Sequence, residues 1–271
     1  MNVHKLWDYR EYIKVNGVML TNELISLLET SLTLLQVENH FSTIQYWGQI
    51  YAMDKDYYIA VGINDDVLND KKYFYTTDFN FWGLLPRAKK KYKFLSLLAT
   101  VPFRGDIAEK IKVLDEALEI NDPDRCRIMK EEKRLTATIS NICEEAEICA
   151  RGQLVKRSDG TAVISPNFYG LTASEAKLLK SYLHIRPAQH KWNTNLLTRA
   201  DYNLSMDFLD SIDMDIPNGC WNLSLENVGT VAYLKSLYWP GMMYFHKIKT
   251  PDAGFLYVGN GRKNLDVPFL L

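Results

Sequence analysis

The stretch YWGQIYAM at residues 46–53, followed by DKD at 54–56 and YYIAVGI at 57–63, decides the fold of this chain of 271 residues. In the second run, alternate positions hold apolar side chains that share one face of an extended strand: Tyr57, Ile59, Val61 and Ile63. Two such runs around a short polar turn predict an antiparallel β-hairpin. A third strand is expected at residues 73–77.

More β-structure is predicted in the second half of the chain. Residues 151–165 indicate a second hairpin, because Ser158-Asp159-Gly160 is a favourable turn sequence. A third hairpin is expected from residues 220–226 and 230–237, which enclose a short turn ending in a glycine. Hairpins dominate this pattern, so the sheet is expected to be antiparallel. Two further strands complete the set, at residues 242–247 and 255–258.

Helical periodicity appears near the N-terminus and again before residue 100. Between residues 21 and 37, apolar side chains recur at helical spacing along one side: Leu24, Ile25, Leu28, Leu32 and Leu35. Polar residues such as Glu23 and Thr30 fall on the other side, so an amphipathic helix is predicted. A second helix is expected from Pro86 to Leu98, since proline is favoured in the first turn.

A third helix is predicted over residues 172–185, where the signals are strongest. Thr172 and Glu175 form a capping-box pattern, and Pro187 follows the last apolar position. His184 falls on the polar side of this segment and is expected at the surface. Two shorter helical pieces are expected after it, at residues 196–200 and 205–211.

Together these elements predict an α+β fold with antiparallel β-hairpins and packed helices, because regular βαβ spacing is absent. We expect a single compact domain over residues 20–271, preceded by an N-terminal extension at residues 1–19. Residues 87–145 are rich in charge and are expected to form an excursion from the core. Within them, KEEKR at residues 130–134 is typical of a solvated helical face.

The composition argues against several classes of function. The 32 basic and 33 acidic residues leave a net charge of −1, which provides no overall field to attract nucleic acid or an anionic membrane. The N-terminus lacks the apolar core of a signal peptide, and no run reaches the ~18 apolar residues of a membrane span. Four cysteines without a CxxC pair favour a reducing, cytoplasmic compartment.

The usual catalytic signatures are missing from the sequence. It contains no G-x-S-x-G, no H-E-x-x-H and no G-x-x-x-x-G-K-[ST], and its five histidines are scattered. An acidic run lacks the spacing of a calcium loop, so a solvated patch or a helix cap is expected at Asp207, Asp210, Asp213 and Asp215. GNGRK at residues 259–263 predicts a turn rather than a phosphate cradle. We therefore expect no catalytic, cofactor or metal site.

Several short segments together carry a family resemblance. They are WGQI at 47–50, DYYIAVG at 56–62, GLTASEAK at 170–177, DFLDS at 207–211, SLYWPG at 236–241, YVGNG at 257–261 and KNLDVPF at 263–269. In this order they resemble the radial spoke head protein 9 family, from about Leu20 to the last residue. Residues 1–19 and 87–127 depart from the family pattern, most clearly at Lys89-Lys90-Lys91.

The resemblance implies a non-enzymatic structural subunit of the radial spoke head in motile cilia or flagella, located in the cytoplasm at the axoneme. It implies that this subunit passes mechanical signals from the central pair toward dynein and is needed for spoke head assembly. The implied partners are other spoke head subunits, chiefly the 4/6-type protein, while the central-pair projections are contacted indirectly. No cofactor is implied.

Candidate docking residues are suggested by the size of their side chains and by their position. We expect Trp239, Tyr244 and the end Phe269-Leu270-Leu271 to contact a partner, because a chain end this apolar is rarely free. The alternative is that these side chains seal the core. Lys89, Lys90 and Lys91 are expected either on the wet face of a helix or against an acidic partner, such as tubulin or a neighbouring subunit.

Two other functions stay open on the sequence alone. A microtubule-binding module would use the basic cluster from Arg87 to Lys93, and its binding would weaken as salt is added. A small-ligand-binding enzyme without a known motif would need a pocket in which polar groups converge.

Overall fold

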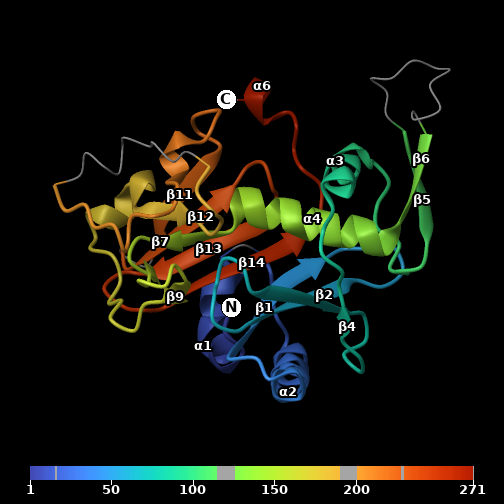
Figure 1. The fold of residues 1–271 in the computed structure, drawn as a ribbon, viewed down its shortest axis with the longest axis horizontal. Coiled ribbons are helices and arrows are strands. Elements are labelled where there is room, and N and C mark those ends of the chain that lie inside the picture. Colours follow the sequence, from blue (N-terminus) through green and yellow to red (C-terminus); the bar gives the residue numbers. More distant parts are fainter. Residues whose placement is uncertain (16, 115–125, 190–199, 227–228, 271) are drawn as a thin grey trace.

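The computed structural model describes residues 1–15, 17–114, 126–189, 200–226 and 229–270. Within these residues, the centre of the fold is an eight-stranded sheet in the order β11-β12-β13-β14-β1-β2-β3-β4 (Figure 1). The α+β class is confirmed, and so are two hairpins predicted within this sheet, β1–β2 and β11–β12. Its strands are β1 (Thr43–Ile50), β2 (Tyr57–Ile63), β3 (Lys71–Thr76), β4 (Gly83–Leu84), β11 (Trp221–Glu226), β12 (Val231–Ser236), β13 (Met242–Lys247) and β14 (Ala253–Gly259).

The sheet joins two halves of the chain through one parallel pair. Strands β1 to β4 pair antiparallel, as do β11 to β14, but β1 and β14 run parallel with Gly48 opposite Tyr257. A wholly antiparallel sheet was therefore the wrong expectation at this pair. A parallel pair needs a long crossover, which most of the chain provides here. A Cβ at Gly48 would lie 2.0 Å from the Tyr257 carbonyl oxygen, so only glycine allows the strands to meet.

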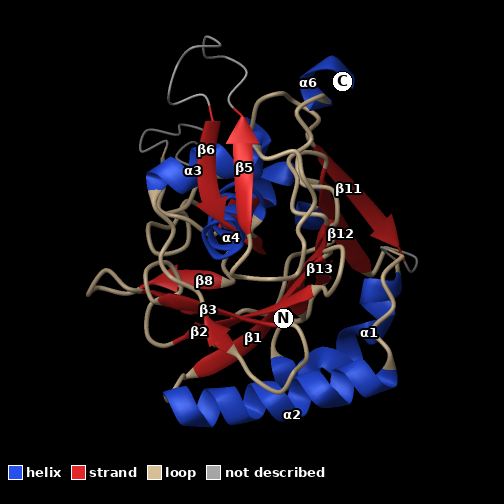
Figure 2. Cartoon of the chain, turned by 90° about the vertical axis from the view of Figure 1, so that its right-hand side faces the viewer, coloured by secondary structure: helices blue, strands red, loops and turns tan. Residues whose placement is uncertain are grey.

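One face of the sheet, which we call the α2 face, is covered by the N-terminal helices (Figure 2). These are the short 3-10 helix η1 (Val3–Lys5), α1 (Leu6–Lys14) and α2 (Asn22–Asn39). The prediction of α2 is confirmed: Thr21 Oγ1 accepts a hydrogen bond from the Leu24 backbone N–H at its start. The packed stripe of the helix is Ile25, Leu28, Leu32 and Leu35. Leu24, expected in this stripe, is only half-buried.

Residues 1–19 also contribute to the α2 face. Met1, Val3 and Leu6 are buried against the sheet, together with Tyr9 and Ile13. The buried Met1 amino group donates a hydrogen bond to the Tyr46 carbonyl oxygen over 2.7 Å. The division into an extension and a domain starting at residue 20 stays a prediction.

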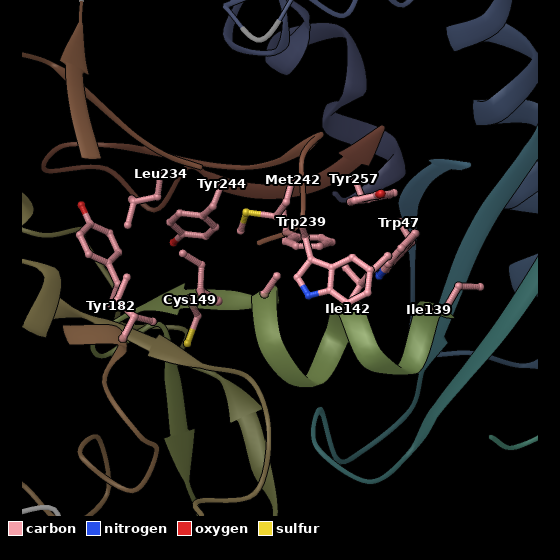
Figure 3. Close-up of a cluster of buried hydrophobic side chains, with 14 of the residues drawn as sticks. Trp47, Ile139, Ile142, Cys149, Tyr182, Leu234, Trp239, Met242, Tyr244 and Tyr257 are labelled. Carbon is pink, nitrogen blue, oxygen red and sulfur yellow. The ribbon is translucent and has the colours of Figure 1, made fainter. Parts of the chain in front are cut away.

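The opposite face, which we call the α4 face, is covered by α4 (Glu131–Ala146) and by irregular segments. Figure 3 shows its aromatic core, in which Trp47, Trp239 and Tyr257 lie between the sheet and α4. The expectation of a solvated face at residues 130–134 is wrong for Glu131 and Arg134, which are buried. Both have polar partners, and these contacts offset the free-energy cost of removing a charged group from water.

The partners of these two residues come from the strands and loops around α4. Glu131 accepts hydrogen bonds from the Tyr57 hydroxyl over 2.8 Å and from the backbone N–H groups of Arg104 and Gly105. The Arg134 guanidinium lies 4.1 Å from the centre of the Phe103 ring. The guanidinium also donates to nearby backbone carbonyls. A charged segment can therefore sit inside the fold.

Smaller elements surround the sheet. Helix α3 (Lys90–Leu98) starts four residues after Pro86, later than predicted, and packs on the hairpin of β5 (Lys110–Leu114) and β6 (Cys126–Lys130). The hairpin predicted at residues 151–165 is confirmed as β8 (Leu154–Lys156) and β9 (Ala162–Ile164). Near the C-terminus lie the 3-10 helix η4 (Ile212–Met214) and α6 (Val267–Leu270).

The helix predicted at residues 172–185 is wrong. The segment instead forms two 3-10 turns, η2 (Glu175–Lys177) and η3 (Leu179–Ser181), and then strand β10 (Tyr182–His184), which pairs with β7 (Ile148–Ala150). The capping box does form, because Glu175 accepts a hydrogen bond from the Thr172 backbone N–H over 3.1 Å. All three residues of β10 are buried, and each lies opposite a residue of β7, so strand pairing replaces the predicted helix here.

The two shorter helical predictions have different outcomes. Residues 205–210 form turns and bends, so the helix expected at 205–211 is wrong. The piece expected at 196–200 lies outside the described residues except for its last position. In the described residues, no helix is both long enough and apolar enough to cross a membrane.

Candidate docking surface

Two adjoining hollows lie where the C-terminal segment crosses the end of the sheet. One, which we call the polar hollow because several charged side chains line it, has a volume of about 410 Å³ and is lined by His184, Asp215, Trp221 and Lys263 among others. The second is mainly apolar, encloses about 290 Å³ and is lined by Leu237, Pro240, Val267 and Leu270 among others. Ser236 at the end of β12 lines both hollows, so they adjoin each other there. We call the two hollows and their rim the C-terminal surface; Figure 2 shows α6 on the same side of the molecule as β11 and β12.

A hydrogen-bonded group of three side chains forms the floor of the polar hollow. His184 Nε2 lies 3.0 Å from Asp215 Oδ2, and Trp221 Nε1 donates to the same oxygen over 2.7 Å. His184 is held by β10 and is almost fully buried, so its expected surface position is wrong. The edge strand β11 positions Trp221. The group therefore ties two distant segments to the loop that carries Asp215.

The acidic run at residues 207–215 is largely internal. Arg151 donates two hydrogen bonds to Asp207, over 2.6 and 2.8 Å, and Arg186 donates to Asp210 over 2.7 Å. Both aspartates are buried, so the expectation of a solvated acidic patch is wrong for them. The bidentate contact of Arg151 with Asp207 supplies the charge and the hydrogen bonds that a buried carboxylate requires. The run thus stabilises the wall of the hollow.

Two groups in the lining of the polar hollow, Cys220 and Glu145, are held in unreactive or occupied states. Burial raises the pKa of the Cys220 thiol to about 11, so this group stays protonated at neutral pH and is a poor nucleophile. Glu145 accepts hydrogen bonds from Trp239 Nε1 over 2.8 Å and from Lys263 Nζ over 2.9 Å. Among the described residues, no group of histidine, cysteine and acidic side chains is placed to hold a metal ion. The Glu145 contacts join α4 to the loop after β12 and to the C-terminal segment.

Exposed apolar side chains rim both hollows. Ile216 lies beside the polar hollow and Leu237 beside the apolar one, and both are exposed. At the end of the described chain, Phe269 is 86% exposed and Leu270 is 73% exposed. Apolar side chains gathered around a concave surface are typical of a protein–protein contact.

The candidate docking residues divide into two groups. Trp239 and Tyr244 are each only 1% exposed and lie in the core (Figure 3). The Tyr244 hydroxyl donates to Gln153 over 2.9 Å, so this side chain is fully occupied inside the fold. Direct docking by Trp239 and Tyr244 is therefore corrected to the alternative, that they seal the core. Phe269 and Leu270 lie on the surface, and Leu271 lies outside the described residues.

The basic residues Lys89, Lys90 and Lys91 are exposed at the start of α3. They line neither of the two hollows. The neighbouring Lys93 forms an ion pair with Glu144 on α4, which holds α3 against the main body. The structure therefore places Leu270 in the lining of the apolar hollow, with Phe269 next to it in the chain, and leaves the lysines as a separate group.

Sequence reasoning missed the polar hollow almost completely. His184 is 31 residues from Asp215 in the sequence, and Trp221 follows Asp215 by six, so the contact depends on how two parts of the chain fold together. The one available signal was Ile216, an apolar residue between an acidic run and a proline.

Comparison with known proteins identifies relatives of the whole chain, although no family model matches it. It is 34% identical to the radial spoke head protein 9 homolog of Bos taurus over 276 residues, which covers 100% of both chains. It is 35% identical to the homolog of Homo sapiens over 249 residues, or 90% of each chain. The homolog of Danio rerio is 35% identical over 262 residues, covering 94% of this chain and 95% of that one. The likeness to the bovine protein includes the C-terminal surface.

Proposed function

The chain belongs to the radial spoke head protein 9 homolog family, and from this premise we propose that it is a non-enzymatic structural subunit of the radial spoke head in the ciliary axoneme. The observation that carries the proposal is the identity of 34% with a relative matched over 100% of both chains. A structural subunit needs its whole fold, and a match over the full length of both chains is what a shared fold produces.

In this role the subunit passes mechanical signals from the central pair toward dynein. The architecture supports the idea, because helices and packed segments cover both faces of one continuous sheet. Close-packed interiors compress little, so a force applied at one edge reaches the other with little loss. Gly48 and Tyr257 join the two halves of the sheet and would lie on the path of that force.

The C-terminal surface is the docking site for a neighbouring spoke head subunit, of the 4/6 type, and so serves assembly of the head. What supports this is the contrast within α6. Val267 is buried and the Asn264 backbone N–H donates to the Tyr238 carbonyl over 2.8 Å, so the segment is anchored. Phe269 and Leu270 nevertheless remain exposed. An anchored segment that keeps its largest apolar side chains in solvent is suited to a partner.

Co-expression tests this docking site. The full chain carrying Phe269→Asp and Leu270→Asp would be expressed with the 4/6-type subunit and purified through it. We expect recovery of the variant to fall by at least about tenfold, since a charge in a buried contact costs more than about 1.4 kcal/mol. The melting temperature should stay within about 2 °C of wild type, because both side chains are exposed.

Phe81→Asp is the matched control, because Phe81 is 75% exposed beside β4, at the opposite edge of the sheet from β11. It should co-purify as wild type does. Equal recovery of the C-terminal variant and this control would reject the docking site, and unfolding of the C-terminal variant would assign Phe269 and Leu270 to the core.

A second candidate is microtubule binding through the basic cluster from Arg87 to Lys93. The observation in its favour is that Lys110 and Lys130 face each other across the β5–β6 hairpin close to α3, and both are exposed. Like charges placed opposite each other repel unless an anion lies between them. Sedimentation of the purified chain with microtubules at rising salt tests this candidate, which requires binding that falls steeply with salt.

A further inference from the structure

Helix α2 carries two side-chain stripes on opposite sides. The packed stripe described above covers the sheet. A second stripe is spaced four, three, four and three residues apart, and at 3.6 residues per turn it lies on the far side of the helix. Its members are Glu23, Leu27, Thr30, Leu34 and Val37. We call it the outer stripe; its three apolar side chains are 52%, 59% and 67% exposed.

The outer stripe differs from the exposed side of the neighbouring helix. Helix α1 exposes Asp8, Glu11 and Lys14, as a surface helix usually does. Its one exposed large apolar residue, Trp7, donates a hydrogen bond to Glu29 of α2 over 3.0 Å. Helix α2 contains no lysine or arginine, and its only charged residues are three glutamates. Leucines and a valine occupy positions on its solvent side that charged residues would normally hold.

The hydroxyl groups near the outer stripe do not need water. Thr30 Oγ1 donates to the Ser26 carbonyl oxygen over 2.9 Å, and Thr33 Oγ1 donates to the Glu29 carbonyl oxygen over 2.7 Å. A partner that covers these residues would leave neither hydroxyl without a hydrogen bond. Covering the stripe therefore gains apolar burial at little polar cost.

We propose that the outer stripe packs against an amphipathic helix of a partner protein, and that lysine or arginine flanks the apolar stripe of this helix. The four-three spacing matches the seam of two packed helices and does not match the two-residue repeat of a strand. Glu23 and Glu38 lie at the two ends of the exposed side, where basic flanking residues would meet them. The outer stripe runs over about 21 Å from Glu23 to Val37, so the contact would span about four turns.

A second copy of this chain does not fit the same surface. In a parallel pair of α2 helices, Glu23 would meet Glu23 and Glu38 would meet Glu38. In an antiparallel pair, Glu23 would meet Glu38. Like charges repel in either arrangement. The contact also lies on the far side of the sheet from α6 (Figure 2), so it stands independently of the proposed C-terminal docking site.

Defined peptides test the proposal with the full chain. One labelled helical peptide carries leucine at every a and d position and lysine at every e and g position, and its match carries glutamate at e and g. Fluorescence anisotropy gives the Kd of each. We expect the lysine peptide to bind at least about tenfold more tightly than the glutamate peptide. In the variant Glu23→Lys with Glu38→Lys, this preference should reverse.

Two further variants locate the binding. Leu27→Ser with Leu34→Ser should weaken binding of the lysine peptide at least about tenfold. Phe269→Ser with Leu270→Ser is the matched control and should bind as wild type does. Thermal unfolding of each variant checks that the fold is intact. Equal binding of the two peptides, or binding untouched by the α2 variants, overturns the proposal.

Discussion

The two faces of the central sheet are covered by different kinds of contact. The α2 face is closed by apolar stripes of helices that are close in sequence to β1. The α4 face also buries charged and polar groups, including Glu131, Arg134 and His246, whose partners are far away in the sequence. One sheet is therefore stabilised mainly by apolar packing on one side and also by specific polar pairs on the other. Substitutions and changes of pH should therefore lower the free energy of unfolding in different ways on the two faces.

The largest effect is expected on the α4 face from Glu131→Ala. The change leaves the Tyr57 hydroxyl and two backbone N–H groups without their acceptor in a buried site. Leaving one buried donor without a partner costs about 1–3 kcal/mol, and three donors are affected, so we expect the free energy of unfolding to fall by about 4 kcal/mol. Urea denaturation measures it. Glu132→Ala, at the half-buried neighbouring position, should cost under about 1 kcal/mol. Equal losses in the two variants would contradict the importance of Glu131 as an acceptor for three buried donors.

On the α2 face, Leu32→Ala should lower the free energy of unfolding by about 3 kcal/mol. Leu32 is fully buried in the packed stripe of α2, and its truncation removes apolar contact and leaves a cavity. Leu34→Ala on the same helix should change stability by less than about 0.5 kcal/mol, because Leu34 is exposed. The same urea titration serves both variants. A large loss in Leu34→Ala would mean that the outer stripe already packs within the chain.

The α4 face should also weaken in acid through His246. Burial lowers the pKa of His246 to about 4, and its Nε2 accepts a hydrogen bond from the Leu171 backbone N–H over 3.0 Å. Between pH 4 and 6.5 the unfolded chain binds a proton that the folded chain does not. Stability should therefore fall as pH drops through this window, by about 3 kcal/mol for this group in full.

The matched variant for this pH dependence is His246→Gln, whose amide oxygen can accept the same hydrogen bond. It should flatten the pH profile of the free energy of unfolding between 4 and 6.5. The buried Met1 amino group, whose pKa burial lowers to about 5, contributes a slope of the same sign between pH 5 and 8 in both chains. The difference between the two profiles therefore isolates His246. Identical profiles would contradict the assignment.

The smallest effect separates two helix-start signals that look alike in sequence. Thr21→Ala removes the cap of the 18-residue helix α2 and should cost about 1 kcal/mol. Thr172→Ala removes the hydrogen bond that Thr172 Oγ1 accepts from the Glu175 N–H at an exposed site and should cost under about 0.5 kcal/mol. Thermal unfolding by circular dichroism resolves the two. A larger loss of stability in Thr172→Ala than in Thr21→Ala would contradict this ranking of the two hydrogen bonds.

The same pair explains which predictions succeeded. Helix α2 and the hairpin of β1 and β2 form where the pattern places them, because neighbouring residues supply both their hydrogen bonds and their apolar faces. Residues 172–185 carry an equally good pattern, but Tyr182 to His184 pair with β7 instead. Local propensity is worth tenths of a kcal/mol per residue, and burying three side chains against another strand outweighs it.

The candidate sites divide in a similar way. The apolar end at Phe269 and Leu270 was visible in the sequence, and so was the basic cluster at Lys89 to Lys91. Their exposure was not, since residues of the same type seal the core at Trp239 and Tyr244. Whether an aromatic side chain is core or surface depends on which segments cover it, and a linear pattern does not carry that information.

By itself, the sequence determined the fold class, the hairpins, helix α2 and the family resemblance, because each depends on residues close together in the chain. Only the tertiary structure decided that Glu131, Arg134, His184, Asp207 and Asp210 are buried, and that β1 meets β14 in parallel. A charged side chain enters the interior only when a partner meets it there. That partner arrives from a distant segment, such as Arg151 for Asp207, and the meeting is a property of the folded chain.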